Sequence, residues 1–252
     1  MKYVRIEKDN VIRWGVLEGE KVLTLQHAPF DGICFDGSSV SLSECTLLAP
    51  GEPSKIVLVG KNYYDHVLEM DENAAIPKYP ILFMKGPNAV NCHEGNVHKP
   101  DFVQRLDYEG ELALVIGKQA KNVKPENAYD YIFGFTCLND ITARDIQSAD
   151  GQWTRAKAMD GFAPFGPLIT DETDGTDLKI ETRLNGKTVQ QSRTSMFMTK
   201  IPEMLAFITS AMTLEPGDIV STGTPAGIGP MKAGDVVEVE VESIGILRNY
   251  VV

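Results

Sequence analysis

The segment RLDYEGELALVIGK, residues 105–118, has the apolar character of a β-strand but carries an acid at every second position. These acids are Asp107, Glu109 and Glu111. Side chains alternate between the two faces of a strand, so the acids would share one face and Leu112, Leu114 and Ile116 the other. The fold must therefore pack the apolar face and provide the acidic face with either solvent or a cation.

Length and composition predict a soluble globular protein. The chain has 252 residues, 43% of them hydrophobic and 23% charged, which is enough to bury a substantial core. It has no run near the roughly 18 to 20 apolar residues of a membrane span, and its start, MKYVRIEKDN, lacks the apolar centre of a signal peptide. We therefore expect a cytoplasmic protein with no membrane partner. The net charge of −11 argues against nucleic acid as a partner, because phosphate binding requires basic clusters.

The first residues predict a small β-rich N-terminal unit. KYVRIE, IRWGVLEG and KVLTL are short β-like runs separated by turn-forming residues. The segment LLAPGEPSK, residues 47–55, contains two prolines and a glycine and is the expected boundary. We therefore expect this unit at residues 1–50 and a catalytic domain at residues 51–252.

Most of the remaining segments also have strand patterns. Asn185-Gly186 separates two strand-like runs and predicts a type I′ hairpin. A helix is expected at residues 200–214, where apolar residues recur on one face, and a short one at residues 61–70, before the prolines of PKYP. Strands do not alternate regularly with helices, as a parallel α/β fold would require. The pattern favours a β-rich α+β fold.

Two of the acids have the spacing of metal ligands. On one strand face, the Cα atoms of Glu109 and Glu111 would lie about 6.6 Å apart, so their carboxylates can converge on one ion. Asp140 ends the apolar run IFGFTCLND and is the expected third ligand. Three carboxylates without Cys or His favour Mg²⁺, Mn²⁺ or Ca²⁺ over zinc.

A solvated strand face is the alternative explanation of the same acids, because E-x-E patterns are common. We assign Asp107 to that alternative. Gly110, between the two glutamates, either forms a bulge or allows a close approach of another backbone. Arg144 and Asp145 are interpreted as a structural ion pair.

Seven segments, in this order, resemble the fumarylacetoacetate hydrolase superfamily: VGKNYYDHVLEM, ILFMKGPNAV, LDYEGELALVIGK, GFTCLNDITARDIQ, WTRAKAMDGFAPFGP, LNGKTVQ and GDIVSTGTPAGIGPM. They cover about residues 55–250. The resemblance implies a mixed β-roll fold, one Mg²⁺ or Mn²⁺ per chain, and a homodimer. It implies that Glu109, Glu111 and Asp140 are the metal ligands, and that the substrate is a small α-keto acid that chelates the ion.

His66 and Glu69 lie three residues apart in the predicted short helix, close enough for the carboxylate to orient the imidazole. Taken alone, they are also typical of a surface pair. The resemblance implies that they are catalytic, activate water, and sit on a mobile lid. The polar and proline-interrupted residues 71–80 would then form its hinge.

The resemblance implies roles for three further residues. Lys157 would stabilise the enolate that develops during the reaction, although a solvated surface lysine is the alternative. Gln147 would orient water or substrate. Thr224 would hold the substrate carboxylate through backbone N–H groups of the loop STGTPAGIG. This loop lacks the G-K-[ST] ending of a phosphate-binding loop. A plain β-turn without a binding role is the alternative.

These residues favour hydrolysis of a C–C bond in a β-diketo acid, of the acylpyruvate or fumarylpyruvate type. A decarboxylase of oxaloacetate-like acids, or an isomerase or hydratase of aromatic-acid catabolism, would use the same site. A non-catalytic binder of keto acids is a hypothesis of another class. The complete set of metal and dyad residues argues against it, because a binder does not need the dyad.

Overall fold

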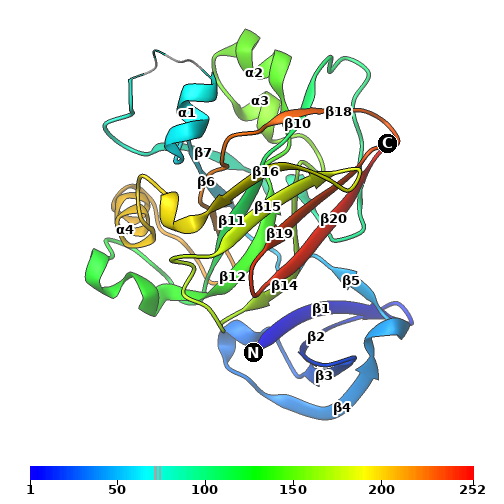
Figure 1. Cartoon of the computed structure of the whole chain (residues 1–252). Coiled ribbons are helices and arrows are strands. Elements are labelled where there is room, and N and C mark those ends of the chain that lie inside the picture. The colour runs from blue at the N-terminus through cyan, green and yellow to red at the C-terminus, as the bar shows by residue number, and fades with distance from the viewer. Residues whose placement is uncertain (71–72, 74) are drawn as a thin grey trace.

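The computed structural model describes residues 1–70, 73 and 75–252. Strands dominate these residues and form three sheets (Figure 1). The helices in this part of the chain are α1 (Tyr64–Met70), α2 (Arg144–Asp150), α3 (Thr154–Lys157) and α4 (Ile201–Ala211). None of them is long and apolar enough to cross a membrane. The expected β-rich α+β fold is confirmed.

The largest sheet has twelve strands. Ten of them follow one another in the spatial order β4 (Phe35–Ser41), β3 (Lys21–Leu25), β2 (Val11–Glu18), β1 (Lys2–Lys8), β14 (Ala163–Thr170), β12 (Ile132–Asn139), β11 (Gly110–Ile116), β17 (Ile219–Ser221), β6 (Ile56–Gly60) and β7 (Ile81–Lys85). The other two are β5 (Thr46–Leu48), which pairs with β1, and β8 (Val90–Asn91), which pairs with β14. Neighbours are antiparallel except for the β17–β6 and β14–β8 pairs.

A second sheet has five strands, in the order β16 (Lys187–Arg193), β15 (Lys179–Leu184), β19 (Val236–Val241), β20 (Gly245–Val251) and β9 (Asn96–Val97). The expected hairpin joins β15 and β16. Both of its turn residues have positive φ, 52° at Asn185 and 77° at Gly186, as a type I′ turn requires.

The second sheet packs on one face of the largest sheet. Leu112 and Leu114 of β11 share a buried cluster with Ile180 of β15 and Val239 of β19. On the opposite face of β11, Ala113 and Val115 belong to another buried cluster. Every residue of β11 is therefore buried, and the alternative of a solvated acidic face is wrong.

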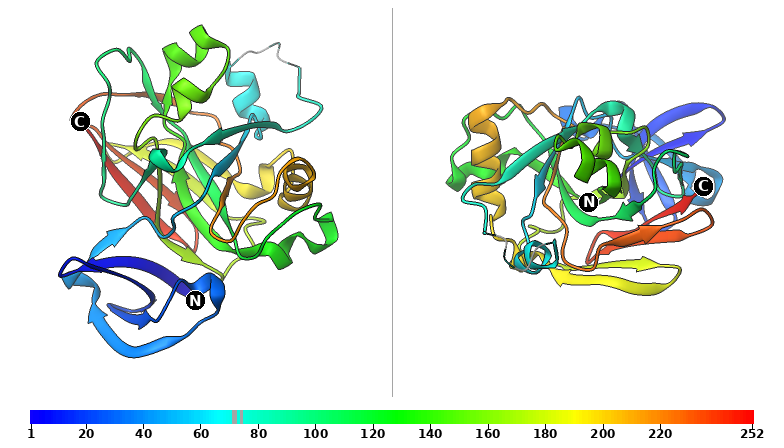
Figure 2. Two further views of the ribbon diagram at one scale, coloured as in Figure 1. Left: turned by 180° about the vertical axis from the view of Figure 1, so that it is seen from behind. Right: turned by 90° about the horizontal axis from the view of Figure 1, so that it is seen from above.

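The N-terminal strands extend the largest sheet. Lys2 and Tyr3 of β1 pair with Thr170 and Ile169 of β14, so the sheet continues across the segment expected as the boundary. That segment, residues 47–55, contains the last two residues of β5 and the whole loop between β5 and β6. Figure 2 shows strands β1–β4 as a lobe at the end of the molecule opposite helices α1, α2 and α3.

A third, small sheet forms the end of the molecule near these helices. Its order is β13 (Thr142–Ala143), β10 (Leu106–Tyr108) and β18 (Gly229–Met231). The acidic segment therefore belongs to two sheets, because it leaves β10 at Tyr108 and enters β11 at Gly110.

Helices α1 and α4 match the expectations, whereas α2 and α3 were not expected from the sequence. Pro125–Tyr131 forms a 3₁₀-helix. Of the expected lid hinge at residues 71–80, Asp71, Glu72 and Ala74 lie outside the described residues.

Gly110 allows the close approach of the two large sheets. A Cβ atom at this position would lie 2.1 Å from Thr182 Oγ1 and 3.2 Å from Val239. We expect Gly110→Ala to lower the free energy of unfolding by about 1–3 kcal/mol, because a filled core resists an added methyl group. Denaturant titration measures this change. Gly51→Ala is the control, because its Cβ would meet Phe165 at an ordinary 3.5 Å, and equal losses in both variants would contradict the prediction.

Candidate metal centre and its cavity

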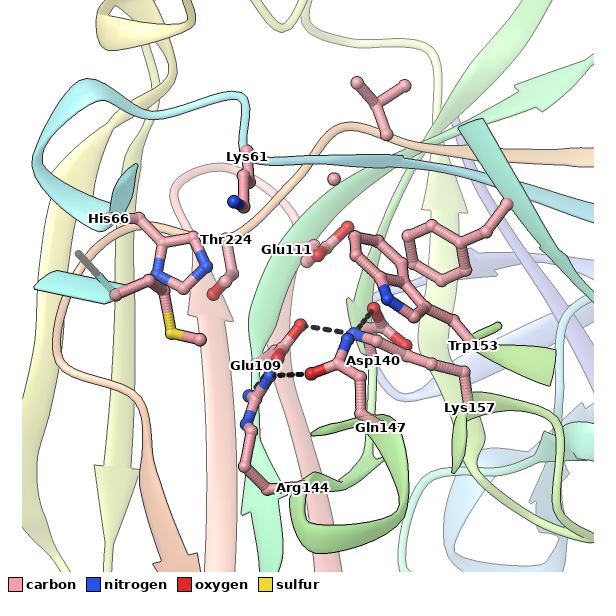
Figure 3. Close-up of a pocket in the computed structure, with 14 residues that line it drawn as sticks. Lys61, His66, Glu109, Glu111, Asp140, Arg144, Gln147, Trp153, Lys157 and Thr224 are labelled. Atoms are coloured by element: carbon pink, nitrogen blue, oxygen red, sulfur yellow. Dashed lines mark hydrogen bonds and ion pairs between the residues drawn. The ribbon is translucent and has the colours of Figure 1, made fainter. Parts of the chain in front are cut away.

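One cavity lies beside the ends of β6, β11 and β12, between α1 on one side and α2 and α3 on the other (Figure 3). The expected site residues that line it are His66, Glu109, Glu111, Asp140, Gln147, Lys157 and Thr224. Glu69 reaches the same site through its contact with His66. The structure thus brings together all the residues that the sequence analysis selected.

Strand register explains why the three acids meet. Gly110 of β11 pairs with Asn139 of β12, so the residues one step beyond, Glu109 and Asp140, face each other at the strand ends. The Asp140 N–H donates to the Glu109 carbonyl at 2.8 Å, and the Glu109 N–H donates to Asn139 Oδ1 at 2.9 Å. Carboxylate oxygens of Glu109, Glu111 and Asp140 all lie within 4.8 Å of one another, and all three residues are buried.

Burial and neighbouring charge give the two glutamates opposite pKa shifts. Burial, together with Asp140 and Glu109, raises the pKa of Glu111 to about 8, although Ser221 Oγ donates to its carboxylate at 2.5 Å. Burial also disfavours the charged form of Glu109, but Lys157 and Arg144 outweigh burial and hold its pKa well below the usual value. Glu111 is therefore the carboxyl group with the least cationic compensation.

The three carboxylates fit a hard divalent cation. Their donor atoms are all oxygen, which suits Mg²⁺ or Mn²⁺. The buried Asp140 Oδ1 accepts no well-directed hydrogen bond from the described residues, although Lys85 Nζ lies 2.6 Å away. Glu111, whose pKa is raised by burial and by the neighbouring acids, forms no ion pair with the described residues.

Lys157 contacts two of the acids. Its Nζ lies 2.7 Å from Glu109 and 2.5 Å from Asp140. Burial disfavours its charged form, but Asp140 and Glu109 outweigh burial and raise its pKa. The alternative of a solvated surface lysine is wrong, because the side chain is 3% exposed.

Asp107, assigned from the sequence to a solvated face, is fully buried. Its two oxygens accept from Arg105 Nε at 2.8 Å and from Arg144 Nε at 2.9 Å. Arg144 in turn donates to Glu109. Asp107 therefore positions the arginine that contacts a candidate metal ligand.

The expected ion pair between Arg144 and Asp145 is wrong. Asp145 instead accepts the backbone N–H groups of Gln104 and Arg105, each at 3.2 Å. The two residues are adjacent at the start of α2, where successive side chains point in different directions. Arg144 also donates to Gln147 Oε1 at 2.6 Å, one turn further along the helix.

His66 is buried in α1 and faces the acids across the cavity (Figure 3). Its Nδ1 lies 3.2 Å from Glu69 Oε2, the contact expected for residues three apart on a helix. Glu69 Oε1 accepts the backbone N–H of Gly227 at 2.9 Å. The same carboxylate therefore orients the imidazole and attaches α1 to the glycine-rich loop.

Thr224 occupies that loop, and its hydroxyl is already bonded. It donates to the Gly110 carbonyl at 2.9 Å and accepts from Gln190 Nε2 at 2.8 Å. A substrate contact at this residue would therefore use the backbone N–H, as the resemblance implied.

Lys85 is a residue that the sequence analysis missed. It is fully buried at the end of β7, and besides its contact with Asp140 it donates to the carbonyls of Ile141, at 3.0 Å, and Phe162. The only signal was a lysine that closes the apolar run ILFM. Its partners come from segments 56 and 77 residues away, so sequence spacing could not reveal them.

We expect Asp107→Asn to weaken Mn²⁺ binding by about 10- to 100-fold, because loss of an outer partner releases the arginine that orients Glu109. Calorimetric titration of the metal-free protein measures the affinity. Arg155→Met is the matched control, because it breaks an ion pair with Asp150 on the surface. Unchanged affinity in Asp107→Asn would show that the pair does not position the ligand.

The raised pKa of Glu111 predicts how stability depends on pH without an ion. The folded protein holds a proton that the unfolded chain, with a carboxyl pKa near the usual 4.5, releases. The stabilisation from this proton is complete below the unfolded-state pKa of 4.5, and it is lost as the pH rises towards the folded-state pKa of about 8. We expect the Tm of the metal-free protein to fall over this range, and Mn²⁺ to reverse the fall. Glu111→Gln, which does not titrate, should show a flatter profile, and an unaltered profile would refute the assignment.

Two family models match successive parts of the chain. The family model described as "Fumarylacetoacetate (FAA) hydrolase C-terminal" matches residues 55–252, and "Rv2993c-like, N-terminal" matches residues 1–50. Oxaloacetate tautomerase YisK of Bacillus subtilis is 42% identical over 84% of this chain and 74% of its own.

Two solved structures cover 100% of this chain and 99% of their own. A 5-carboxymethyl-2-hydroxymuconate delta-isomerase from Mycobacterium smegmatis is 38% identical, with a TM-score of 0.94. A fumarylacetoacetate hydrolase from Exiguobacterium antarcticum is 36% identical, with a TM-score of 0.89. The chain therefore belongs to the fumarylacetoacetate hydrolase family.

Proposed function

We propose that this protein is a divalent-metal-dependent enzyme that moves a proton at C3 of a 2-oxo acid, as a keto–enol tautomerase or isomerase does. The observation that carries the proposal is the placement of His66, paired with Glu69, opposite the acidic triad in one cavity. A base on one side and a cation site on the other are what removal of a proton next to a carbonyl group requires.

The triad of Glu109, Glu111 and Asp140 would hold the ion, which would supply Lewis-acid polarisation of the 2-oxo group. His66 takes the proton from C3, the C–H electron pair becomes the C2–C3 double bond, and the C2–O π pair moves onto the 2-oxo oxygen. The enol forms when that oxygen takes up a proton from solvent, and the reverse steps return the keto form. Glu69 stabilises the charged imidazole that results.

Lys157 stabilises the oxygen on which negative charge develops. A lysine ammonium has three donors, and Glu109 and Asp140 occupy two of them. The third is available to the substrate. Gln147 orients the substrate through its side-chain NH₂ group, because its side-chain carbonyl oxygen already accepts a hydrogen bond from Arg144.

The names of the relatives support proton transfer as the first hypothesis, ahead of hydrolysis. The tautomerase YisK and the mycobacterial isomerase are 42% and 38% identical, and both names describe rearrangement without hydrolysis. The expectation from the sequence alone ranked C–C hydrolysis first.

Hydrolysis of an acylpyruvate is the second candidate. The contact between His66 Nδ1 and Glu69 favours it, because an imidazole oriented by a carboxylate can also activate water. The 36% identical relative is named as a fumarylacetoacetate hydrolase. The two candidates share the site and differ in whether the enzyme admits water to the distal carbonyl group.

The test follows the ultraviolet absorbance of oxaloacetate enol with Mn²⁺-loaded protein. We expect faster equilibration with the keto form than with the ion alone, and a loss of about 10²- to 10⁴-fold in His66→Ala, which lacks the base. Glu69→Gln should be slower than the parent protein, and His98→Ala, at an exposed position, should not. A rate that survives loss of His66 would contradict the proposal.

Pyruvate release separates the remaining hypotheses. Pyruvate formed from an acylpyruvate would support hydrolysis. Pyruvate formed from oxaloacetate, unaffected by His66→Ala, would support decarboxylation, which needs only the metal and a stabilised enolate. Binding of these acids without any turnover would support the non-catalytic binder. The homodimer stays a prediction, which sedimentation velocity measures.

A further inference from the structure

We propose that Lys61 binds a second carboxylate of the substrate, so that the cavity selects dicarboxylic 2-oxo acids. The inference rests on the proposed function for the position of the other end of the substrate, at the acidic triad. Lys61 lines the same cavity, and Figure 3 shows its side chain pointing into it. Nothing in the sequence analysis assigned this residue a role.

Lys61 differs from the other cationic side chains of the cavity in having no acidic partner among the described residues. Arg144 is bonded to Asp107 and Glu109. Lys157 is shared between Glu109 and Asp140. The ammonium of Lys61 is therefore free to bind an anion that the chain itself does not supply.

The backbone of Lys61 has an uncommon conformation, which an ordinary surface lysine does not require. Its φ is 57°, in the left-handed region that is uncommon for residues other than glycine. Asn62, which follows, donates to the carbonyls of Thr222 and Thr199 at 2.8 and 3.2 Å and accepts the Thr199 N–H at 2.8 Å. These contacts attach the turn to the loops beside the cavity, so the strained residue is fixed in place.

The neighbour on the other side of Lys61 provides an apolar wall. A Cβ atom on Gly60 would lie 2.9 Å from the Trp153 ring, so glycine lets the indole pack directly against the backbone. Trp153 and Phe83 both line the cavity and contact each other edge to face. An apolar wall excludes water, which strengthens an ion pair formed at the ammonium.

The test compares oxaloacetate with 2-oxobutanoate, which has a methyl group in place of the second carboxylate. Loss of C3 protons to D₂O, followed by NMR with Mg²⁺-loaded protein and corrected for the exchange without protein, reports proton removal from both. We expect Lys61→Met to lower kcat/KM for oxaloacetate by on the order of 10- to 100-fold, mainly through KM, because a charge-assisted hydrogen bond is lost. It should leave 2-oxobutanoate nearly unchanged.

Lys61→Arg keeps the charge and should retain most of the preference for oxaloacetate. Lys187→Met is the matched control, because Lys187 is an exposed lysine outside this cavity with no ion pair among the described residues. Equal effects of Lys61→Met on both substrates, or none, would overturn the inference.

A binding measurement separates failure of this inference from failure of the proposed function. If neither acid exchanges protons, calorimetry with Mn²⁺-loaded protein still measures their binding. A preference for oxaloacetate that Lys61→Met abolishes would then support the second carboxylate site and refute proton transfer. Proton exchange that does not depend on Lys61 would support proton transfer and refute the site.

Discussion

The compensation of buried carboxylates by buried cations is the constraint on which the candidate site depends. Asp107, Glu109, Glu111 and Asp140 are each at most 4% exposed, and isolated charges in such surroundings would be costly. Ion pairs with Arg144, Lys157 and Lys85 compensate three of them. Glu111 has hydrogen bonds from Ser221 and Gly223 but no cationic partner among the described residues, so it is the carboxyl group that a bound ion would compensate.

The fold supports this cluster by placing two strand ends side by side. The register of β11 and β12 sets Glu109 against Asp140, and packing on both faces of β11 prevents that register from slipping. The small sheet containing β10 and the helix α2 then supply Asp107 and Arg144. The cations therefore come from segments that the apolar core holds rigidly, as a preorganised electrostatic site requires.

Helix α1 brings a different element to the same cavity. It is short, and beyond its packing at Val67 it is attached through Glu69 to the backbone of Gly227. That contact uses the carboxylate that orients His66, so docking of the helix and orientation of the imidazole are coupled.

Local patterns in the sequence predicted much of the fold. Alternation predicted most strands, Asn185-Gly186 predicted the hairpin, and the spacing of Ile201, Leu205 and Ile208 predicted α4, because each depends only on neighbouring residues. Helices α2 and α3 were not predicted, because they are only one or two turns long and their apolar residues have no clear helical period. The spacing of Glu109 and Glu111, with Asp140 at the end of a strand, was enough to suggest a metal site.

The sequence by itself determined much of the strand content and the hairpin turn, because these follow from the period of side chains and from turn chemistry. It made the acidic triad a candidate metal site, which the family resemblance favoured over a solvated strand face. Only the tertiary structure decided that Asp107 is buried, that Arg144 pairs with it and with Glu109 in place of Asp145, and that Lys61 has no acidic partner among the described residues. Those outcomes depend on which distant strand ends meet. The pairing register between β11 and β12, which joins residues some 30 positions apart, decides which strand ends lie together. No local sequence pattern encodes that register.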